Sequence, residues 1–485
     1  QTHPTFWPLP IQASRHPGPM QQVTSMMGTA QMQTKPPPSS NDNALDDGGG
    51  SLPSIVRDVI RHVFINTVIV SFLFMIMCIV AMPLYPLDGM PSTSYMRASV
   101  KWSTSQLIKS IFPSTFADGE LWGVADKWEA NAWAEWERIT SESSPSSSVL
   151  EMPVLDLRTC TATSDDATTT CSSSSPSLSE VKRALGDDFL SRPLLLRGIW
   201  SEEQLADPNR RLSLDGMQQH ADLATLAVPY YADATKSGYS AMKPSGVAPL
   251  RDIVSNITNH QGKQKIGSQV LVETYPSLIE EVAPIDVVTS IFGNHFHSDS
   301  IKGSGPFRVF PAWTTVPVFL AGSEVAQHAA NDGDISTAET EQNSKHPRTD
   351  LHCEPIGNIA VQLHGSKMWS LVPSEQSVLL KPSVSRHGRA FYYSSLDPLD
   401  PTALSSIPHY TVTTNAGDAL WVPPWMWHRV DYLNIVDEAT KVEPRTSLAA
   451  SLFHFRPVDF LANNPLFAFL LIPNLVKELL GRNTE

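Results

Sequence analysis

Residues 349–373 read TDLHCEPIGNIAVQLHGSKMWSLVP, and they combine two side chains that can ligate a metal with the pattern of a β-hairpin. His352 and Glu354 are two residues apart, so in an extended strand both point to one face while Cys353 points to the other. Residues 358–363 alternate as a strand, Gly365-Ser366 is typical of a turn, and residues 367–372 form a second strand. The stretch therefore predicts a metal site framed by a hairpin.

A second motif, ALWVPPWMWH at residues 419–428, offers a third ligand. Residues 415–418 indicate a turn, residues 419–422 a buried strand, and Pro423-Pro424 a rigid break before the strand that carries His428. A lone histidine between tryptophans would be read as a core imidazole, but the first motif favours a ligand. Two imidazoles and one carboxylate are the set that holds non-haem Fe(II) on one face and leaves other positions open. The predicted metal ligands are His352, Glu354 and His428.

Two other His-x-Asp triplets compete with the first motif. His220-Ala221-Asp222 lies in a helical pattern, where residues two apart diverge around the axis. His297-Ser298-Asp299 lies in a loop rich in serine and glycine with His295, where any metal binding would be incidental. Cys353 is expected to pack in a core, since a thiolate ligand favours zinc over iron that activates oxygen.

The order of residues across both motifs resembles the JmjC and cupin-like 2-oxoglutarate oxygenases, especially the branch that includes the asparaginyl hydroxylase acting on hypoxia-inducible factor. The resemblance is dense over residues 305–455, reaches back weakly to Pro153–Leu157 and Arg192–Gly198, and leaves out everything before residue 150. The positions that carry it are Thr349, His352, Glu354, Asn358, Gln362, Gly365, Lys367, Trp369, Val372-Pro373, Gly417-Asp418, Leu420, Val422-Pro423 and Trp427-His428.

This resemblance implies a mainly β fold, the antiparallel double-stranded β-helix or jelly-roll barrel of cupins, with flanking helices. It implies an Fe(II)- and 2-oxoglutarate-dependent hydroxylase. Lys367, on the strand beside the metal strand, could give a dianion a charge-assisted hydrogen bond of about 1.5 to 3 kcal/mol; its alternative is a solvated hairpin lysine. The resemblance assigns His352, Glu354 and His428 to Fe(II), and Thr349, Asn358 and Lys367 to 2-oxoglutarate.

The chain departs from this pattern at two places. Many members of the group carry aspartate where this chain has Glu354. On the last barrel strand, where related hydroxylases often have Asn and Trp, residues 451–455 read SLFHF. A polar co-substrate contact is then either lost or supplied by Ser451 or His454. Leu452 therefore favours the rival interpretation, a non-catalytic cupin-like binding module at the membrane, and Lys367 with Thr349 favours the enzyme.

Five segments are expected along the chain. Residues 63–82 carry no formal charge and are long enough to cross a bilayer as one N-terminal transmembrane helix, with a buried soluble helix as the alternative. Within the stem, residues 121–139 are expected to form an amphipathic helix with a stripe that includes Trp128 and Trp136. The segments are a disordered cytosolic tail at 1–55, the anchor at 63–82, a helical stem at 98–145, the oxygenase domain at 150–456 and C-terminal helices at 457–485.

Charges on either side of the apolar run predict its orientation. Arg57 and Arg61 directly precede it, whereas Arg97 follows after a gap, so the bias predicts a type II protein with its catalytic domain in the lumen of the endoplasmic reticulum or Golgi, or outside the cell. The sequon Asn256-Ile257-Thr258 and the pair Cys160/Cys171, which either form a disulfide or remain free thiols, fit that placement.

The composition and the C-terminal residues bear on partners. The net charge of −14, from 35 basic and 49 acidic residues, argues against nucleic acid as a partner. Residues 466–472 are apolar, Pro473 is expected to break the helix, and residues 475–480 resume it. These helices either cover the barrel or form a homodimer seam, as the C-terminal helices of related hydroxylases do. The substrate, a protein side chain or a small molecule, is left open.

Overall fold

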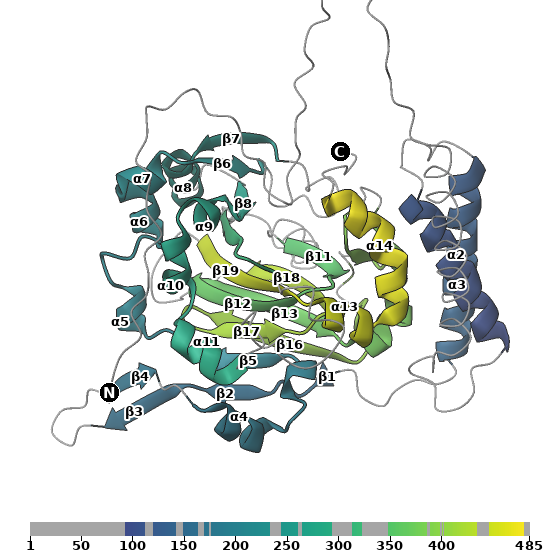
Figure 1. Ribbon diagram of the computed structural model, residues 1–485, viewed down its shortest axis with the longest axis horizontal. Coiled ribbons are helices and arrows are strands. Elements are labelled where there is room, and N and C mark those ends of the chain that lie inside the picture. Colours follow the sequence, from purple (N-terminus) through teal and green to yellow (C-terminus); the bar gives the residue numbers. More distant parts are fainter. Residues whose placement is uncertain are drawn as a thin grey trace, which may run out of the picture.

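Two β-sheets that face each other form the centre of the computed structural model, and helices cover their outer faces (Figure 1). Side chains from both sheets, among them Leu420 and Val430, meet in one core between the sheets. The structure describes residues 93–111, 120–141, 149–162, 169–173, 176–232, 244–259, 264–292, 313–322, 348–385, 389–397, 400, 402–433 and 446–479.

The first sheet carries both metal-ligand motifs. Its strands, in spatial order, are β1 (Val149–Leu150), β16 (His409–Asn415), β13 (Ser366–Val372), β18 (Trp427–Leu433), β11 (Arg348–Cys353), β15 (Tyr392–Ser394) and β14 (Pro382–Val384). All neighbours pair antiparallel except β1 with β16.

The second sheet faces the first. Its strands, in spatial order, are β2 (Val154–Asp156), β5 (Leu194–Arg197), β17 (Ala419–Val422), β12 (Gly357–His364), β19 (Thr446–Phe455), β10 (Val318–Gly322) and β8 (Lys265–Ser268), with β9 (Trp313–Thr315) also paired to β19. Two small pairs lie apart, β3 (Arg158–Ala162) with β4 (Thr169–Ser173) and β6 (Ala227–Tyr230) with β7 (Gly246–Pro249).

The outer face of the second sheet packs on helices that come before the metal motifs in the sequence. Ile359 and Val361 of β12 contribute to that core together with Ile253 of α8 and Ile291 of α11. The helices of this part are α4 (Leu178–Leu185), α5 (Glu202–Leu205), α6 (Leu214–Gln219), α7 (Ala221–Ala224), α8 (Leu250–Thr258), α9 (Val270–Thr274), α10 (Ile279–Val282) and α11 (Ile285–Phe292), with 3-10 turns at Phe189–Ser191 and Pro276–Leu278.

A second group of helices packs on the outer face of the first sheet. Trp102 of α2 and Phe467 of α14 meet Tyr392 of β15 in a cluster of aromatic rings. The helices of this group are α2 (Thr93–Ile111), α3 (Glu120–Ser141), α13 (Pro457–Asn463) and α14 (Pro465–Leu479), with a 3-10 turn at Ser374–Leu380. α14 packs against α2, so part of its apolar surface is covered within the same chain.

The predicted β-hairpin and the buried strand at residues 419–422 are confirmed, with small differences. β12 was expected to alternate between a buried and an exposed face, but both faces are buried because it is a central strand between two packed layers. Pro473 was expected to end a helix, yet it lies inside α14, so the prediction was wrong. A proline removes one backbone hydrogen bond from a helix, and packing of the flanking apolar residues can offset that loss.

The amphipathic helix predicted at residues 121–139 corresponds to α3, but its buried stripe was partly wrong. Trp128, expected in the buried stripe, is 37% exposed, whereas the charged residue Glu129 is buried. Glu129 pairs with Lys109 of α2, a partner that the spacing within α3 could not reveal. No helix in the described part of the chain is sufficiently long and apolar to traverse a bilayer. The predicted anchor at 63–82 and tail at 1–55 lie outside the described residues.

Candidate metal centre

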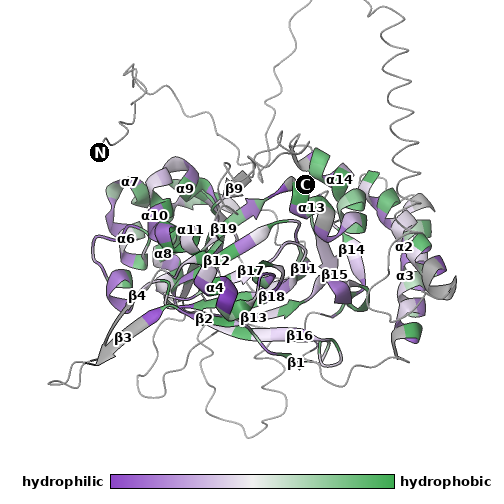
Figure 2. Cartoon of the chain, turned by 60° about the horizontal axis from the view of Figure 1, so that its bottom comes forward, coloured by the Kyte–Doolittle hydropathy of each residue, from purple (hydrophilic) through white to green (hydrophobic). Residues whose placement is uncertain are grey.

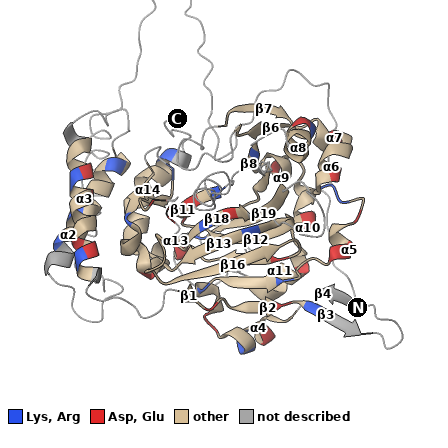
Figure 3. Ribbon diagram, turned by 180° about the vertical axis from the view of Figure 1, so that it is seen from behind, with Lys and Arg blue, Asp and Glu red and all other residues tan. Residues whose placement is uncertain are grey.

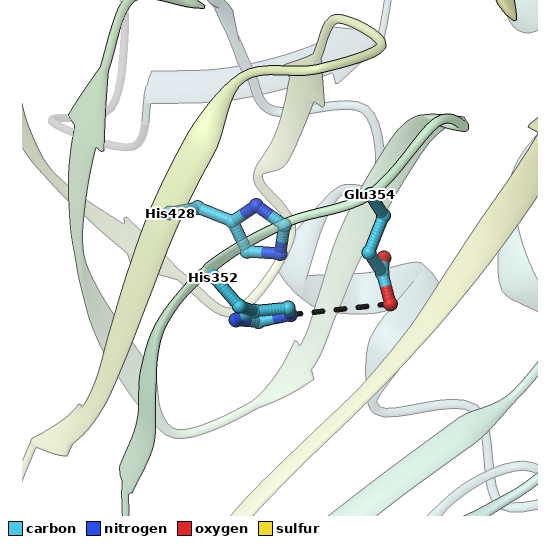
Figure 4. Close-up of side chains that lie close together, drawn as sticks. All are labelled: His352, Glu354 and His428. Carbon is cyan, nitrogen blue, oxygen red and sulfur yellow. Dashed lines mark ion pairs between the residues drawn. The ribbon is translucent and has the colours of Figure 1, made fainter. Parts of the chain in front are cut away.

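His352, Glu354 and His428 converge at one point inside the barrel (Figure 4). One ligand atom from each lies within 4.8 Å of the others, and within the described ranges this is the one such group of three or more metal-ligating side chains. His352 Nε2 lies 3.9 Å from Glu354 Oε1, and the two imidazole rings are 4.2 Å apart between centroids. Three donors converging without a bond between them are suited to hold a cation.

Backbone hydrogen bonds fix the tautomer of both imidazoles. His352 Nδ1 lies 2.7 Å from the carbonyl oxygen of Asp350, and His428 Nδ1 lies 3.1 Å from that of Met426. Because a carbonyl can only accept, each Nδ1 must carry the hydrogen. The lone pair of each Nε2 is therefore left for a metal. In metal sites, hydrogen bonds behind the ligands commonly fix the histidine tautomer in this way.

Burial acts on the three ligands in the direction that a metal site requires. Loss of hydration lowers the pKa of His352, and it lowers the pKa of His428 to about 3, with the neighbouring His352 adding to the shift. Both imidazoles are thus neutral at pH 7. Loss of hydration also raises the pKa of Glu354 to about 7, because a carboxylate in a dry site without a cation is costly.

The strand register explains how the two motifs meet. β11 pairs antiparallel with β18 so that His352 lies directly opposite His428 and Cys353 opposite Trp427. Cys353 and Trp427 therefore point outward, where both are fully buried in the aromatic cluster with α2 and α14. Burial raises the pKa of the Cys353 thiol well above its usual range. The expectation that Cys353 packs in a core is confirmed.

A β-bulge brings Thr349 to the same face as His352. The two residues are three apart, which in a regular strand would place them on opposite faces. The register shifts between them, since Thr349 pairs with Val430 and His352 with His428. One extra residue in β11 thus turns both side chains inward, and the Thr349 side chain hydrogen-bonds the hydroxyl of Tyr432.

Lys367 is buried on the same inner face, with 3% of its surface exposed. It pairs with Tyr432 of β18 and Thr414 of β16, and its ammonium lies 4.6 Å from the ring centroid of Tyr432 and 5.4 Å from that of Phe319. Desolvation lowers the pKa of Lys367 to about 7. The solvated hairpin lysine that the sequence left open is excluded, and a buried cation in an aromatic cage is suited to bind an anion.

Asn358 lies across the barrel on β12, opposite Phe453 of β19 and Val422 of β17. It is 5% exposed, and its Oδ1 is a buried acceptor without a hydrogen-bond partner in the described part of the structure. A buried acceptor is costly to leave unpaired, so the site has capacity for one more donor.

Leu452 does not face the metal centre. It pairs with Ile359, and both belong to the core between the second sheet and the helices outside it. Ser451 pairs with Ala360, whose side chain lies in the core between the sheets, so Ser451 points inward, as does Phe453 opposite Asn358. Leu452 therefore points away from the centre and does not itself bear on the rival, non-catalytic interpretation, because neighbours on a strand point to opposite faces.

The competing histidines do not form a second centre in the described residues. His220 links α6 to α7 with an extended backbone, so the expected continuous helix there is two short ones. Neither His220 nor Asp222 belongs to a metal-ligating group. His295, His297 and Asp299 lie outside the described residues.

Several residues at the site had no signal in a motif. Phe391 packs edge-on against His352 with 6.0 Å between ring centroids, and Tyr432 and Phe319 enclose Lys367. Tyr432 could have been found by counting in twos from His428 along β18. Phe391 and Phe319 come from other strands and strand ends, and only the sheet topology brings them to the metal centre.

Trp425 joins the two motifs. Its backbone N–H donates a hydrogen bond of 2.8 Å to the carbonyl oxygen of Glu354. Its φ angle is positive, at 66°, a backbone conformation that is strained for residues other than glycine. Its ring stacks on Phe460 at 5.7 Å between centroids and touches Phe467. Packing of this ring in the aromatic cluster offsets the strained backbone beside the ligands.

We expect Trp425→Gly to destabilise the protein less than Trp425→Ala, by about 1 kcal/mol, which reverses the usual order of the two residues. Both lose the ring, at a cost of about 3 to 5 kcal/mol, but only glycine relieves the strain at positive φ. Urea unfolding of both variants gives the comparison, and an alanine variant at least as stable as the glycine variant would contradict it.

The facing sheets define a double-stranded β-helix protein, and its convergent His, Glu and His side chains could hold a divalent metal. A family model of the cupin-like domain matches residues 191–454, more than half of the chain. The chain therefore belongs to the cupin-like domain family, in the cupin and JmjC group. No curated protein matches it.

Proposed function

We propose that the chain is a membrane-anchored hydroxylase that depends on Fe(II) and 2-oxoglutarate and acts on a protein or small-molecule substrate. The observation that carries the proposal is the pairing, inside one barrel, of a cation site at His352, Glu354 and His428 with a buried cation at Lys367. A binding module would need the first, but a buried lysine beside it is explained by an anionic co-substrate.

The donor set fits iron. Two neutral imidazoles and one carboxylate, without a thiolate, suit Fe(II) with open positions. When bound, Fe(II) together with 2-oxoglutarate supplies the activation of O2 that hydroxylation of a C–H bond requires. Phe391 beside His352 and the bond from Trp425 N–H to Glu354 O hold two of the ligands in place.

The inward positions of β18 lead from the metal ligands to Lys367, where 2-oxoglutarate would bind. The inward positions run from His428 through Val430 to Tyr432, which lies opposite Lys367. That run covers about 13 Å of strand, and the long lysine side chain reaches back across part of it. Lys367 would bind the distal carboxylate with Thr349 and Tyr432 beside it, and Asn358 would lie close to the co-substrate.

The order of motifs from Thr349 to His428 also resembles that of the asparaginyl hydroxylase acting on hypoxia-inducible factor. This supports a protein side chain as one class of substrate. A comparison of proteins from membrane and secretory fractions, with and without the gene, by mass spectrometry would identify the substrate by the added oxygen atom.

The direct test is succinate formation by the purified full-length chain with Fe(II), ascorbate and 2-oxoglutarate. Oxygenases of this kind slowly decarboxylate 2-oxoglutarate without their substrate, so we expect succinate above the level of a His352→Ala control. Iron binding without 2-oxoglutarate binding or succinate would replace the hydroxylase with the non-catalytic binding module.

We expect 2-oxoglutarate to bind more weakly as the pH rises above about 7. Below that pH the Lys367 side chain of the free protein is already protonated. Above it this side chain is neutral, and it must take up a proton when the 2-oxoglutarate dianion binds. The affinity should fall by up to about tenfold per pH unit. Tyr432 faces Lys367, but its pKa is raised to about 12, so it stays neutral throughout.

Calorimetry of the Mn(II)-loaded protein in two buffers of different ionisation enthalpy measures the proton uptake. We expect little uptake near pH 6 and close to one proton above pH 8. In the Lys367→Met variant the proton uptake should be the same at every pH. If that variant still shows the rise in uptake seen in the wild-type protein, the titration belongs to another group.

We propose further that residues 63–82 anchor the chain as a type II protein with the barrel in a lumen or outside the cell. Asn256 of the sequon is exposed on α8, and Cys160 lies directly opposite Cys171 across β3 and β4. Opposed residues of an antiparallel pair have the Cα spacing of a disulfide, a bond that forms in oxidising compartments.

In sealed microsomes, added protease should digest residues 1–60 and leave residues 98–485 intact. The same protected fragment should carry a glycan at Asn256 that Asn256→Gln removes, and should resist alkylation at Cys160 and Cys171 until reduced. Digestion of the barrel in intact vesicles would reverse the orientation.

A further inference from the structure

Helix α2 buries its polar side and exposes apolar side chains. Val100 is 46% exposed and Ile111 is 48% exposed, and Ile108 between them is partly exposed. These three residues lie on one face of the helix, because the spacings between their positions are close to whole numbers of helical turns. The buried polar residues of the same helix are Ser99, Ser103, Ser105, Gln106, Lys109 and Ser110.

The inversion has a cause in the packing of α2 on the barrel. β14 is the edge strand of the first sheet, and α2 covers it: Trp102 Nε1 donates to Pro382 O, and Gln106 Oε1 accepts from the backbone N–H of Val384. Ser110 donates to the carbonyl oxygen of Leu470 in α14. Gln106 satisfies one N–H of the edge strand from this face, and Gln106 and Lys109 also pair with Glu129 of α3. These contacts keep the polar side chains buried, and the apolar stripe faces outward.

Helix α3 buries mainly apolar residues, Trp122, Ala125, Ala132 and Trp136, but it too exposes apolar side chains. Val124 is 41% exposed and Trp128 is 37% exposed, while Glu129 is buried against Lys109 and Gln106. Figure 2 shows hydrophobic, green segments on both helices at the edge of the molecule. The pair of helices, α2 with α3, is called the α2–α3 hairpin below.

Basic side chains accompany the apolar ones. Arg97 and Lys127 are exposed and Lys101 is partly exposed, and blue segments appear on both helices in Figure 3. Helix α2 carries no acidic residue, whereas α3 also exposes Asp126, Glu135 and Glu137, and Glu135 pairs with Arg138. The basic character of this surface therefore comes mainly from α2, in a chain with a net charge of −14. Aliphatic groups and tryptophan with flanking lysine and arginine are typical of helices that lie at a bilayer surface.

The position of the hairpin in the sequence limits what can cover it. α2 begins at Thr93, and ten residues separate it from Met82, where the uncharged run ends. Ten residues span at most about 36 Å when fully extended. A bilayer that holds residues 63–82 is therefore within reach of the hairpin on every molecule.

We propose that the exposed face of the α2–α3 hairpin, formed by Val100, Ile108, Ile111, Val124 and Trp128, lies against the lipid surface of the membrane in which the chain is anchored. Arg97, Lys101 and Lys127 contact lipid phosphates there. This inference rests on the proposed anchorage. It gives the barrel a fixed orientation to the membrane, since the same hairpin is joined to β14 and, through Trp102 and Tyr392, to the strand beside His352.

The test places a spin label on the hairpin of the full-length chain in nanodiscs of phosphatidylcholine and phosphatidylserine. Cys78, Cys160 and Cys171 are first replaced by serine, and single labels are attached at Val100→Cys or Val124→Cys. Matched controls are Val154→Cys on β2 and Val247→Cys on β7, two valines outside the hairpin that are 48% and 58% exposed. Collision with O2, which concentrates in lipid, is compared with collision with a water-soluble nickel chelate.

We expect labels at 100 and 124 to collide more with O2 than with nickel, and labels at 154 and 247 to show the reverse. Four labels that all favour nickel would overturn the docking and leave the anchorage standing. Low collision with both reagents together with spin–spin broadening would show that a second copy covers the face, which also overturns it.

Failure of the anchorage gives a different result. If alkaline carbonate releases the chain from the bilayer, flotation with preformed vesicles of the same lipids tests the hairpin alone. The docking is supported if the wild-type chain floats with the vesicles and the double variant Val100→Glu, Val124→Glu does not. The control variant Val154→Glu, Val247→Glu should still float. Absence of flotation overturns it.

Discussion

Replacing His352 or His428 by alanine is expected to abolish stoichiometric binding of Fe(II) or Mn(II). Two donors cannot hold a divalent ion tightly, and loss of even a hydrogen-bond partner behind a ligand costs about ten- to a hundredfold in affinity, so loss of a ligand should cost more than about a hundredfold. Titration of the purified variants with Mn(II), followed by the signal of the free ion, measures this without any reaction.

The control for this prediction is His220→Ala. His220 lies between α6 and α7 and takes no part in the metal-ligating cluster, so its removal should leave the stoichiometry unchanged. Circular dichroism establishes that each variant is folded. Tight binding that survives in both ligand variants would exclude His352 and His428 as ligands.

Replacing Lys367 by methionine should weaken 2-oxoglutarate about thirtyfold and leave metal binding intact. Loss of one charge-assisted hydrogen bond costs about 2 kcal/mol, which corresponds to that factor. Methionine keeps a long apolar stem within the cage of Tyr432 and Phe319, so the fold should not suffer. Succinate formation at increasing 2-oxoglutarate concentration, together with Mn(II) titration, separates the two effects.

A lysine on the surface provides the matched comparison. Lys182 on α4 has a side chain that is 44% exposed and pairs with Asp187, so Lys182→Met should change neither 2-oxoglutarate affinity nor metal binding. If Lys367→Met leaves the 2-oxoglutarate requirement unchanged, the buried ammonium does not bind the distal carboxylate, and its role would be confined to the packing of the barrel.

Sequence alone was sufficient for the local geometry of the metal centre. His352 and Glu354 share a face because strands repeat every two residues, and Pro423-Pro424 forces a corner before His428 whatever surrounds them. The hairpin and the strand at 419–422 were found for the same reason, since a turn and a run of apolar residues are properties of neighbours in the chain.

Which partner each face meets was decided only by the tertiary structure. The bulge that turns Thr349 inward, the outward direction of Leu452 and the burial of Glu129 in place of Trp128 all depend on residues far away in the sequence. The inverted face of α2 has the same origin, because Gln106 bonds the edge strand β14 and Lys109 pairs with Glu129 of α3. A repeating pattern specifies that a helix or strand has two unlike faces, whereas the register and the opposing layer determine which of them is buried.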